Sequence, residues 1–484
     1  MVARPAPACH ALVGGRTVAR CTCARVPCQF SDLPDGTDDK PVGHPVKLGV
    51  VSLGCDKATV DSERLVGDLV GHGAQIVTDL EAADLILINT CGFIDAAKRE
   101  SIEAMLQAAA LKGKSGVKAV VAVGCLVQRY QRELQREMPE IDMFLGFGDL
   151  HKLVPELARR GLIEDPVAVH PGVRQHLGEA AHVRYLKISE GCDHTCAFCA
   201  IPLMRGKHRS EPLERLVLEA QQLELQGAKE ISLVAQDLGH YGRDLGPAGP
   251  KLPDLLAALL RETGVPWLRL LYVYSLGLTE RVISLMASEP RIVPYIDLPI
   301  QHASDRMLER MRRPERQETI RRKVAQLRDA IPSITVRTTT IVGFPGETSA
   351  DFRVLSDFAQ EIEFERLGVF TYSAQEGTRA TQYPDDVPED LKRSRQEELL
   401  ELQRTISEDR LARYVGEETE VLIERIAYPD EHGFTHVGRV KWQADDVDGV
   451  TYVSQAGWAT PGSFIGGKIV DNQDYDFELE AVVP

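Results

Sequence analysis

Three cysteines lie within eight residues near the middle of the chain, and their spacing is typical of a metal centre. Cys192, Cys196 and Cys199 follow a short alternating apolar run at 184–189, which predicts a strand and places the thiols in the loop at its carboxyl end. Each thiolate can hold one iron of a cubic 4Fe-4S cluster, and three protein ligands leave the fourth iron open to a substrate. The pattern therefore indicates a reactive site rather than an electron carrier.

A structural zinc site is the alternative interpretation of the same cysteines. Zinc takes four ligands, and His194 or His208 could supply the fourth. His194 lies between two of the thiols in a cramped loop, which disfavours it as a ligand of the same ion. The sequence therefore favours iron and sulfide over zinc.

Three further cysteines stand at the ends of predicted strands nearer the N-terminus. Apolar runs at 46–53, 84–90 and 117–124 each precede a helical pattern, at about 58–71, 95–111 and 126–137, and this alternation predicts a parallel sheet covered by helices. Cys55, Cys91 and Cys125 follow the three strands, and ligands of such sheets gather outside the carboxyl ends of the strands. We therefore predict that they converge on a second cluster. The alternative is that each cysteine packs a strand end as a small apolar residue.

The rest of the chain divides into a larger α/β region and a small all-β region. Helical runs at 213–226 and 316–330 separate candidate strands at 184–189, 230–235, 267–274, 294–298, 335–342 and 366–372, which predicts a partial, TIM-like (β/α)6 barrel over 178–410, with its chemistry at the carboxyl face. Short strands broken by Gly and Pro, at 421–426, 437–442, 450–453 and 468–470, predict a small barrel over 414–484. The fold class is therefore α/β, with an N-terminal parallel-sheet domain over 46–165.

The N-terminus and the composition limit the class of protein. Residues 1–45 mix Pro, Gly, Arg and Cys without apolar periodicity, which predicts a disordered tail and leaves its cysteines, Cys9, Cys21, Cys23 and Cys28, without an assigned role. There is no apolar run of about 20 residues and no secretory signal, so we expect a soluble cytoplasmic protein without a membrane partner. Ten cysteines in such a protein indicate metal or redox ligands rather than disulfides.

The cysteine motifs resemble those of a known enzyme family. Cys-x3-Cys-x2-Cys at 192–199, with Phe198 before the last cysteine, looks like the cluster motif of the radical S-adenosylmethionine (SAM) enzymes. The segment 51–63, Val-Ser-Leu-Gly-Cys-Asp-Lys-Ala-Thr-Val-Asp-Ser-Glu, resembles the start of the methylthiotransferase family. That family usually has Asn where this chain has Ala58, and its aspartate-modifying branch usually has Pro where this chain has Asp56. Residues 446–453 resemble the TRAM domain, an OB-like barrel that closes these enzymes.

The resemblance implies cofactors, site residues and an activity. It implies one 4Fe-4S cluster on Cys192, Cys196 and Cys199, an auxiliary 4Fe-4S cluster on Cys55, Cys91 and Cys125, and SAM contacts from Phe198, Gly227, Glu230 and Gly343. The family attaches a methylthio group either to an adenosine of transfer RNA or to the β-carbon of an aspartate in the twelfth protein of the small ribosomal subunit. The phrases at 185–192 and 201–206 resemble the second branch. An electron donor of the flavodoxin or ferredoxin type would serve as a further partner.

Charge separates the two candidate substrates. Residues 414–484 contain fourteen acidic and four basic residues, which gives them −10 of the net charge of −16. A surface that tracks a phosphate backbone should be basic, so this domain should repel RNA and attract a basic protein. We therefore predict a basic ribosomal protein as partner and keep tRNA methylthiolation as the alternative. A two-cluster electron carrier is a third hypothesis, but it has no use for a barrel of this length or for an open iron.

A basic run at 306–328 leaves one further possibility open. It carries nine basic residues against three acidic ones. Such a run is usually the solvated face of a helix, and binding of phosphate or RNA is the alternative.

Overall fold

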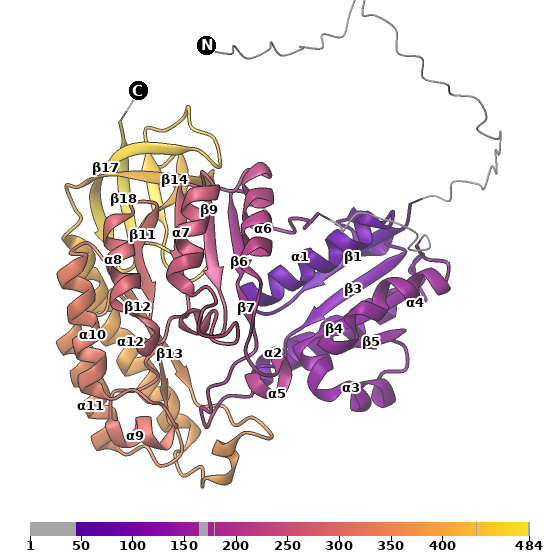
Figure 1. The fold of residues 1–484 in the computed structure, drawn as a ribbon, viewed down its shortest axis with the longest axis horizontal. Helices are drawn as coiled ribbons and strands as arrows, with labels where there is room; N and C mark the ends of the chain where they lie inside the picture. Colours follow the sequence, from indigo (N-terminus) through magenta and orange to yellow (C-terminus); the bar gives the residue numbers. More distant parts are fainter. Residues whose placement is uncertain (1–44, 164–172, 179, 432, 483–484) are drawn as a thin grey trace, which may run out of the picture. The chain divides into compact units, whose positions relative to one another are not determined.

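The computed structural model describes residues 45–163, 173–178, 180–431 and 433–482 (Figure 1). Residues 1–44 of the predicted tail, with their four cysteines, lie outside this part of the chain. Among the described helices, none combines the length and the apolar character that crossing a membrane requires.

The N-terminal domain is a parallel sheet with helices on both faces (Figure 1), as predicted. Its strands are β1 (Lys47–Ser52), β2 (Gln75–Val77), β3 (Leu85–Thr90), β4 (Ala119–Gly124) and β5 (Met143–Leu145), in the order β2-β1-β3-β4-β5. Helices α1 (Asp56–Gly71) and α4 (Leu153–Arg159) pack on one face, and α2 (Asp95–Leu111) and α3 (Cys125–Glu137) on the other. Every residue of β3 and β4 is buried because both faces are covered, which explains their unbroken apolar sequence.

The central domain is the predicted partial barrel of six parallel strands. In spatial order they are β13 (Arg366–Thr371), β12 (Thr335–Val342), β11 (Ile292–Asp297), β10 (Trp267–Leu270), β9 (Glu230–Val234) and β6 (Val183–Lys187). Six helices alternate with them along the chain: α6 (Leu213–Leu225), α7 (Leu252–Glu262), α8 (Glu280–Ser288), α10 (Gln317–Ala330), α11 (Ser349–Ile362) and α12 (Glu389–Ala412). β10 is shorter than the predicted strand at 267–274, because Tyr272 adopts a left-handed backbone with φ of 62° that no strand continues.

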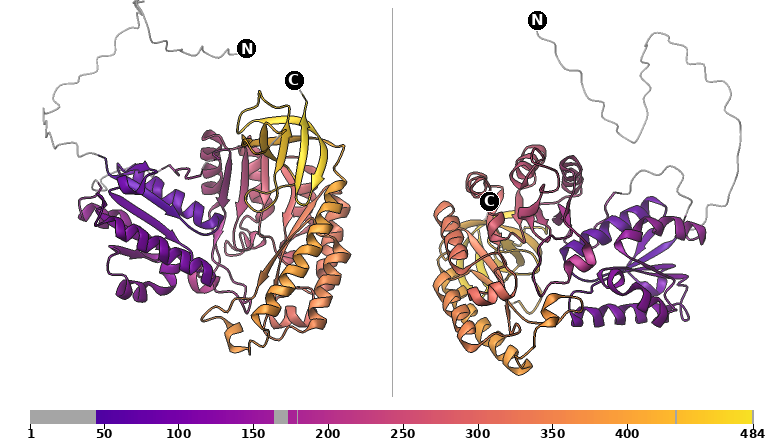
Figure 2. Two further views of the ribbon diagram at one scale, coloured as in Figure 1. Left: turned by 180° about the vertical axis from the view of Figure 1, so that it is seen from behind. Right: turned by 60° about the horizontal axis from the view of Figure 1, so that its bottom comes forward.

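The C-terminal domain is a closed five-stranded barrel, as predicted, drawn in yellow in Figure 2. Its order is β14 (Glu418–Ile426), β15 (His436–Val440), β16 (Thr451–Ser454), β18 (Asp476–Ala481) and β17 (Phe464–Gln473). Its core includes Trp442, Ile469 and Phe477, on which Tyr414 packs. Strand β18 has no counterpart among the predicted strands. It closes the barrel by pairing parallel to β16 and antiparallel to β17.

Candidate active site: two groups of cysteines at the ends of parallel strands

The first group of cysteines lies in a loop at the carboxyl face of the central barrel. Strand β7 (Ser189–Glu190) precedes the loop and pairs antiparallel with β8 (Arg209–Ser210), so the loop is closed at its base. Gly191 begins the loop with φ of 75°, and a Cβ at this position would lie 2.1 Å from the carbonyl oxygen of Lys207. Only glycine fits there, which fixes the path of the chain into Cys192.

The interior of the loop is tied to the barrel. The amide of Ala197 donates to the carbonyl of Met311 at 2.9 Å, and the amide of Ala380 donates to the carbonyl of Ala197 at 2.8 Å. Cys196 Sγ lies 3.8 Å from the hydroxyl of Tyr274 and 3.9 Å from Arg313 Nη1. Segments that follow β10, β11 and β13 therefore hold the thiols in place.

The surroundings of these thiols favour a metal cluster. Burial raises the pKa of Cys192 to about 11 and that of Cys199 to about 12, and the neighbouring cysteines add to both shifts. A thiol in such surroundings is inert unless a bound metal stabilises the thiolate. Three thiols, those of Cys192 and Cys196 buried and that of Cys199 partly exposed, fit the donor set of a 4Fe-4S cluster with one open iron.

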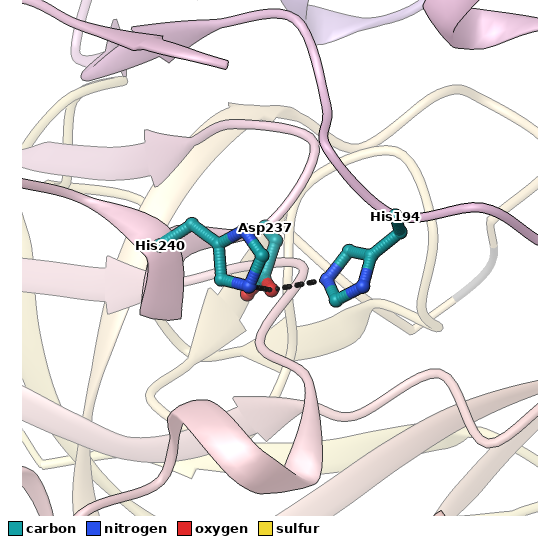
Figure 3. A group of neighbouring side chains, drawn as sticks. All are labelled: His194, Asp237 and His240. Carbon is teal, nitrogen blue, oxygen red and sulfur yellow. Dashed lines mark hydrogen bonds and ion pairs between the residues drawn. The ribbon is translucent and has the colours of Figure 1, made fainter. Parts of the chain in front are cut away.

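The histidine between these cysteines belongs to a hydrogen-bond network (Figure 3). His194 Nε2 lies 2.8 Å from Asp237 Oδ2, and His240 Nε2 lies 3.3 Å from the same oxygen. The His194 ring stacks on His240 at 4.3 Å and on Tyr274 at 4.1 Å between ring centroids. Burial by itself raises the pKa of Asp237, but the hydrogen bond from His194 and the imidazoles outweigh it and lower the pKa. The network anchors the cysteine loop to the end of β9.

These distances disfavour the zinc alternative. In the described part of the chain, only His194, Asp237 and His240 bring three metal-ligating atoms within 4.8 Å of one another. Thiolates on a tetrahedral zinc lie about 3.8 Å apart, given Zn–S bonds of about 2.3 Å, so the three thiols are spread too widely for one zinc ion. His208 also points elsewhere, since its Nε2 lies 3.1 Å from Ser210 Oγ. A polynuclear cluster, whose thiolates bind different irons, does not require such close thiols.

The second group of cysteines lies at the carboxyl ends of three strands of the N-terminal sheet. Cys55 precedes α1, Cys91 follows β3, and Cys125 begins α3 directly after β4. A Cβ at Gly54 would lie 3.5 Å from Cys91 Sγ, so the loops of Cys55 and Cys91 touch. Burial raises the pKa of Cys91, and it raises that of Cys125 to about 11; Cys55 adds to both shifts, and Cys91 adds to that of Cys125. The structure thus brings together the three cysteines that the sequence places 36 and 34 positions apart.

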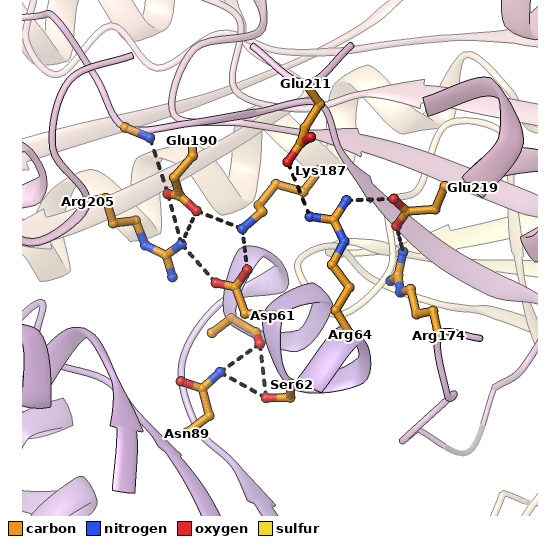
Figure 4. Close-up of polar contacts among 12 residues, drawn as sticks. Asp61, Ser62, Arg64, Asn89, Arg174, Lys187, Glu190, Arg205, Glu211 and Glu219 are labelled. Carbon is orange, nitrogen blue, oxygen red and sulfur yellow. Dashed lines mark hydrogen bonds and ion pairs between the residues drawn. The ribbon is translucent and has the colours of Figure 1, made fainter. Parts of the chain in front are cut away.

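An arginine near both groups of cysteines, Arg205, forms ion pairs with Asp61 and Glu190 (Figure 4). Helix α5 (Ile201–Arg205) begins two residues after Cys199, and its last residue, Arg205, opposes the rise in the pKa of Cys125. Arg205 Nη1 donates to Asp61 Oδ2 at 2.9 Å and to Glu190 Oε1 at 3.0 Å. Lys187 donates to the same two carboxylates. This partly buried network of four charges fixes α1, which begins beside Cys55, against the loop that carries the first group.

Asp61, Ser62 and Glu63, which belong to the segment that resembles the methylthiotransferase family, each form polar contacts that hold α1 in place. After Asp61, Ser62 accepts a hydrogen bond from Asn89 Nδ2 at 2.9 Å within its own domain. Glu63 then binds Arg174 at 2.5 Å and Arg184 at 3.2 Å, both outside the sheet of its domain. Sequence patterns gave no sign of the roles of Lys187 and Arg205; the only signal was that both lie within phrases typical of the family.

The four residues predicted to contact SAM lie at opposite ends of the barrel, two at each end. Phe198 packs beside the ends of β12 and β13, and Gly343 follows β12, so both lie at the carboxyl face with Cys192, Cys196 and Cys199. Their contact with SAM stays a prediction.

The assignment of Gly227 and Glu230 as SAM contacts is wrong. Glu230 is the first residue of β9 and Gly227 precedes it, so both lie at the amino end of the barrel, opposite the cysteines. The Glu230 carboxylate is fully buried and binds Arg269 at 2.5 Å and Arg439 at 2.8 Å. It joins the barrel to the C-terminal domain.

Some acidic side chains of the C-terminal domain face the central barrel rather than solvent. The carboxylate of Asp448 is 1% exposed and lies 3.8 Å from Arg337 and 3.9 Å from Arg366. Asp445 accepts a hydrogen bond from the hydroxyl of Tyr185 at 3.0 Å. These acids bind the barrel, whereas Glu417, Glu418, Glu420, Asp430, Asp446, Asp471 and Glu480 are exposed.

Several arginines of the basic run at 306–328, among them Arg306, Arg313, Arg321 and Arg328, form ion pairs within the fold. Arg313 is buried beside Glu315, and Arg306 binds Asp351. Arg321 bridges Glu318 at 2.6 Å and Glu361 at 2.5 Å. These pairings favour the interpretation as a helix face over a phosphate site.

Comparisons with known proteins agree with this architecture. Family models match residues 47–146 (uncharacterized protein family UPF0004), 186–359 (radical SAM superfamily) and 415–482 (TRAM domain). The ribosomal protein uS12 methylthiotransferase RimO of Geobacter sulfurreducens is 44% identical over 446 residues, which cover 90% of this chain and 98% of the relative. The chain belongs to the RimO family of radical SAM methylthiotransferases. Another RimO, from Myxococcus xanthus, is 43% identical over 90% of this chain and 92% of its own length.

One solved structure supports the fold of this RimO family member. The radical SAM methyltransferase TsrM from Kitasatospora setae superposes with a TM-score of 0.50 at 15% identity, over 67% of this chain and 73% of TsrM. At that identity the likeness concerns the fold alone. Membership of the radical SAM superfamily implies SAM and one 4Fe-4S cluster as cofactors.

Proposed function

We propose that this protein transfers a methylthio group to the β-carbon of an aspartate in ribosomal protein uS12. The observation that carries the proposal is the pair of three-thiol groups at the carboxyl ends of parallel strands, in two domains that Arg205 and Asp61 join. Relatives named for uS12, with 44% and 43% identity, favour this substrate over tRNA.

Each group of residues has a separate part in this proposal. When bound, two 4Fe-4S clusters and SAM supply a 5′-deoxyadenosyl radical, a sulfur atom and a methyl group. Cys192, Cys196 and Cys199 would hold the cluster that binds SAM, and Cys55, Cys91 and Cys125 the auxiliary one. Arg205 offsets negative charge beside Cys125, and with Asp61, Lys187 and Glu190 it fixes the separation of the two groups. Rigid support of this kind holds reacting atoms at the distance and orientation that the reaction requires.

The partners follow from charge and chemistry. The exposed acids of the C-terminal domain, among them Glu417, Glu420 and Asp471, favour a basic protein such as a ribosomal subunit component. Attraction of this kind speeds encounter and weakens with salt, because the Debye length is about 8 Å at physiological ionic strength. An electron donor of the flavodoxin or ferredoxin type would supply electrons, and a ribosomal target favours a reaction in the cytoplasm.

Mass spectrometry of uS12 tests the proposed function. Incubation of the reconstituted protein with SAM, a reductant and unmodified uS12 should increase the mass of one aspartate-containing peptide by a CH2S unit. The same reaction with unmodified tRNA serves as the control. Methylthiolation of tRNA with uS12 left unchanged would contradict the proposal.

The iron content tests the presence of two clusters. Anaerobic reconstitution should give about eight irons per chain, because each three-thiol group supports one cubic cluster of four. Changing Cys55, Cys91 and Cys125 together to alanine should lower the count to about four, as should the same change at Cys192, Cys196 and Cys199. Iron and sulfide analysis makes the measurement. A parent protein with one zinc and no sulfide would rule out both clusters.

A further inference from the structure

A buried lysine without a carboxylate partner extends from the N-terminal domain to the carboxyl end of the barrel. Lys57 is 7% exposed, and its Nζ donates to the carbonyl of Ala235 at a long 3.4 Å. The same Nζ lies 3.3 Å from the centroid of the Tyr272 ring. Ala235 directly follows β9, and Tyr272 follows β10 by two residues. Within the described residues, no carboxylate oxygen lies within 4.0 Å of this ammonium group.

Other buried lysines in this chain show what Lys57 lacks. Lys187 donates to the carboxylates of Asp61 and Glu190, and Lys392 donates to those of Asp385 and Glu389. Burial of an ammonium is costly unless charge and hydrogen bonds compensate it. A ring face and one long hydrogen bond compensate only part of that cost. Lys57 is therefore poised to accept an anionic ligand.

The surroundings of Lys57 are held in a strained conformation. Tyr272 has φ of 62°, which is rare for a bulky residue and typical of functional sites. Its amide donates to Asp297 Oδ2 at 3.1 Å, and its hydroxyl donates to Asp56 Oδ2 at 3.0 Å. Asp56 and Asp297 thus hold the ring beneath the ammonium group and are themselves engaged.

Lys57 lies near both groups of cysteines. Lys57 follows Cys55 by two residues, and the carbonyl it contacts, that of Ala235, precedes Asp237 by two. Asp237 binds His194, which lies between Cys192 and Cys196. An anion on Lys57 would therefore lie close to both groups of thiols, where the reacting carbon of the substrate has to be.

We propose that Lys57 binds the side-chain carboxylate of the substrate aspartate and thereby selects it. This inference rests on the proposed function. A carboxylate gives the ammonium a charge-assisted hydrogen bond and leaves the adjacent β-carbon exposed to the reacting groups. An adenine base offers no such charge. SAM also carries a carboxylate, so the experiment has to separate the two sources.

Binding of uS12 to the full-length, reconstituted protein tests the proposal. The probes are fluorescently labelled uS12 and its variant in which the modified aspartate, identified by mass spectrometry, is asparagine. For the parent protein, asparagine should weaken binding about tenfold or more, as expected for loss of a hydrogen bond between charged groups. For Lys57→Met, both forms of uS12 should bind equally, about as weakly as the asparagine form binds the parent. Lys112→Met is the matched control, because Lys112 already binds Asp142 at 2.7 Å.

The remaining outcomes are distinct. If Lys57→Met raises the Kd for SAM without uS12 present, and the preference for aspartate over asparagine persists, the carboxylate is that of SAM and the proposal is overturned. A persisting preference with altered iron content or a lower Tm assigns Lys57 to the cluster or to the fold, which also overturns it. If the parent leaves uS12 unmodified, the proposed function fails and this inference with it. If the parent modifies uS12 but binds both forms equally, only the role of Lys57 fails.

Discussion

Replacement of Cys196 by alanine is expected to abolish reductive cleavage of SAM, whereas replacement of Cys91 should spare cleavage and remove only the methylthiolated product. Cys196 lies in the barrel beside Tyr274 and Arg313, and its loss leaves two thiolates at that site. The loss in rate should exceed about 100-fold, because even residues that only support a metal ligand change affinity or activity about 10- to 100-fold. Cys91 lies in the other domain, where its amide donates a hydrogen bond to Ser101 Oγ at 2.9 Å.

Two measurements separate these effects. The yield of 5′-deoxyadenosine with a chemical reductant reports cleavage of SAM, and mass spectrometry of uS12 reports the product. Cys192→Ala should behave like Cys196→Ala, and Cys125→Ala like Cys91→Ala, which gives each variant a matched partner in its own group. An equal loss of 5′-deoxyadenosine in both pairs would show that the two groups do not have separate functions.

The architecture could be predicted because local sequence and topology agree. The apolar runs of β3 and β4 are buried on both faces, and each ends at a cysteine. Because the carboxyl ends of parallel strands meet at one edge of a sheet, a sequence pattern could predict the convergence of Cys55, Cys91 and Cys125. Strand β18 is not among the predicted strands because three of its six residues are acidic, and its pairing with β16 and β17 depends on the tertiary fold.

The networks around the site could not be predicted in the same way. The contacts of Arg205 with Asp61 and of Lys57 with Ala235 span 144 and 178 positions, and no periodicity links such residues. The position of Glu230, in contrast, follows from topology. Its place at the start of a predicted parallel strand puts it at the amino end of the barrel, whereas the chemistry lies at the carboxyl end.

Replacement of Glu230 by glutamine should strongly destabilise the protein without weakening the binding of SAM. Glu230 is fully buried between Arg269 and Arg439, so the change leaves two buried guanidinium groups without their shared counter-charge. Removal of one partner from a buried ion pair typically costs about 3–5 kcal/mol. Glu361→Gln is the matched control, because Glu361 binds Arg321 at the same 2.5 Å but at the surface, where about 1 kcal/mol or less is expected. Unfolding in urea measures both. A Glu230→Gln protein of normal stability with a raised Kd for SAM would restore the original assignment.

The pH dependence of this difference identifies its electrostatic origin. Burial by itself raises the pKa of Glu230, but Arg269 and Arg439 outweigh it and lower the pKa to about 2. The unfolded chain should have a value of about 4.3 for this group. The native state therefore gains stability from Glu230 above that pH and loses it as the pH falls towards 2, because the unfolded state then binds the proton more readily. The difference in unfolding free energy between the parent and Glu230→Gln should be constant from about pH 7 to 5 and shrink below about pH 4, where a protonated glutamic acid becomes equivalent in charge to glutamine. Other acids titrate alike in both proteins and cancel from the comparison, so a difference that stays constant down to pH 2 would show that packing, and not charge, accounts for the effect.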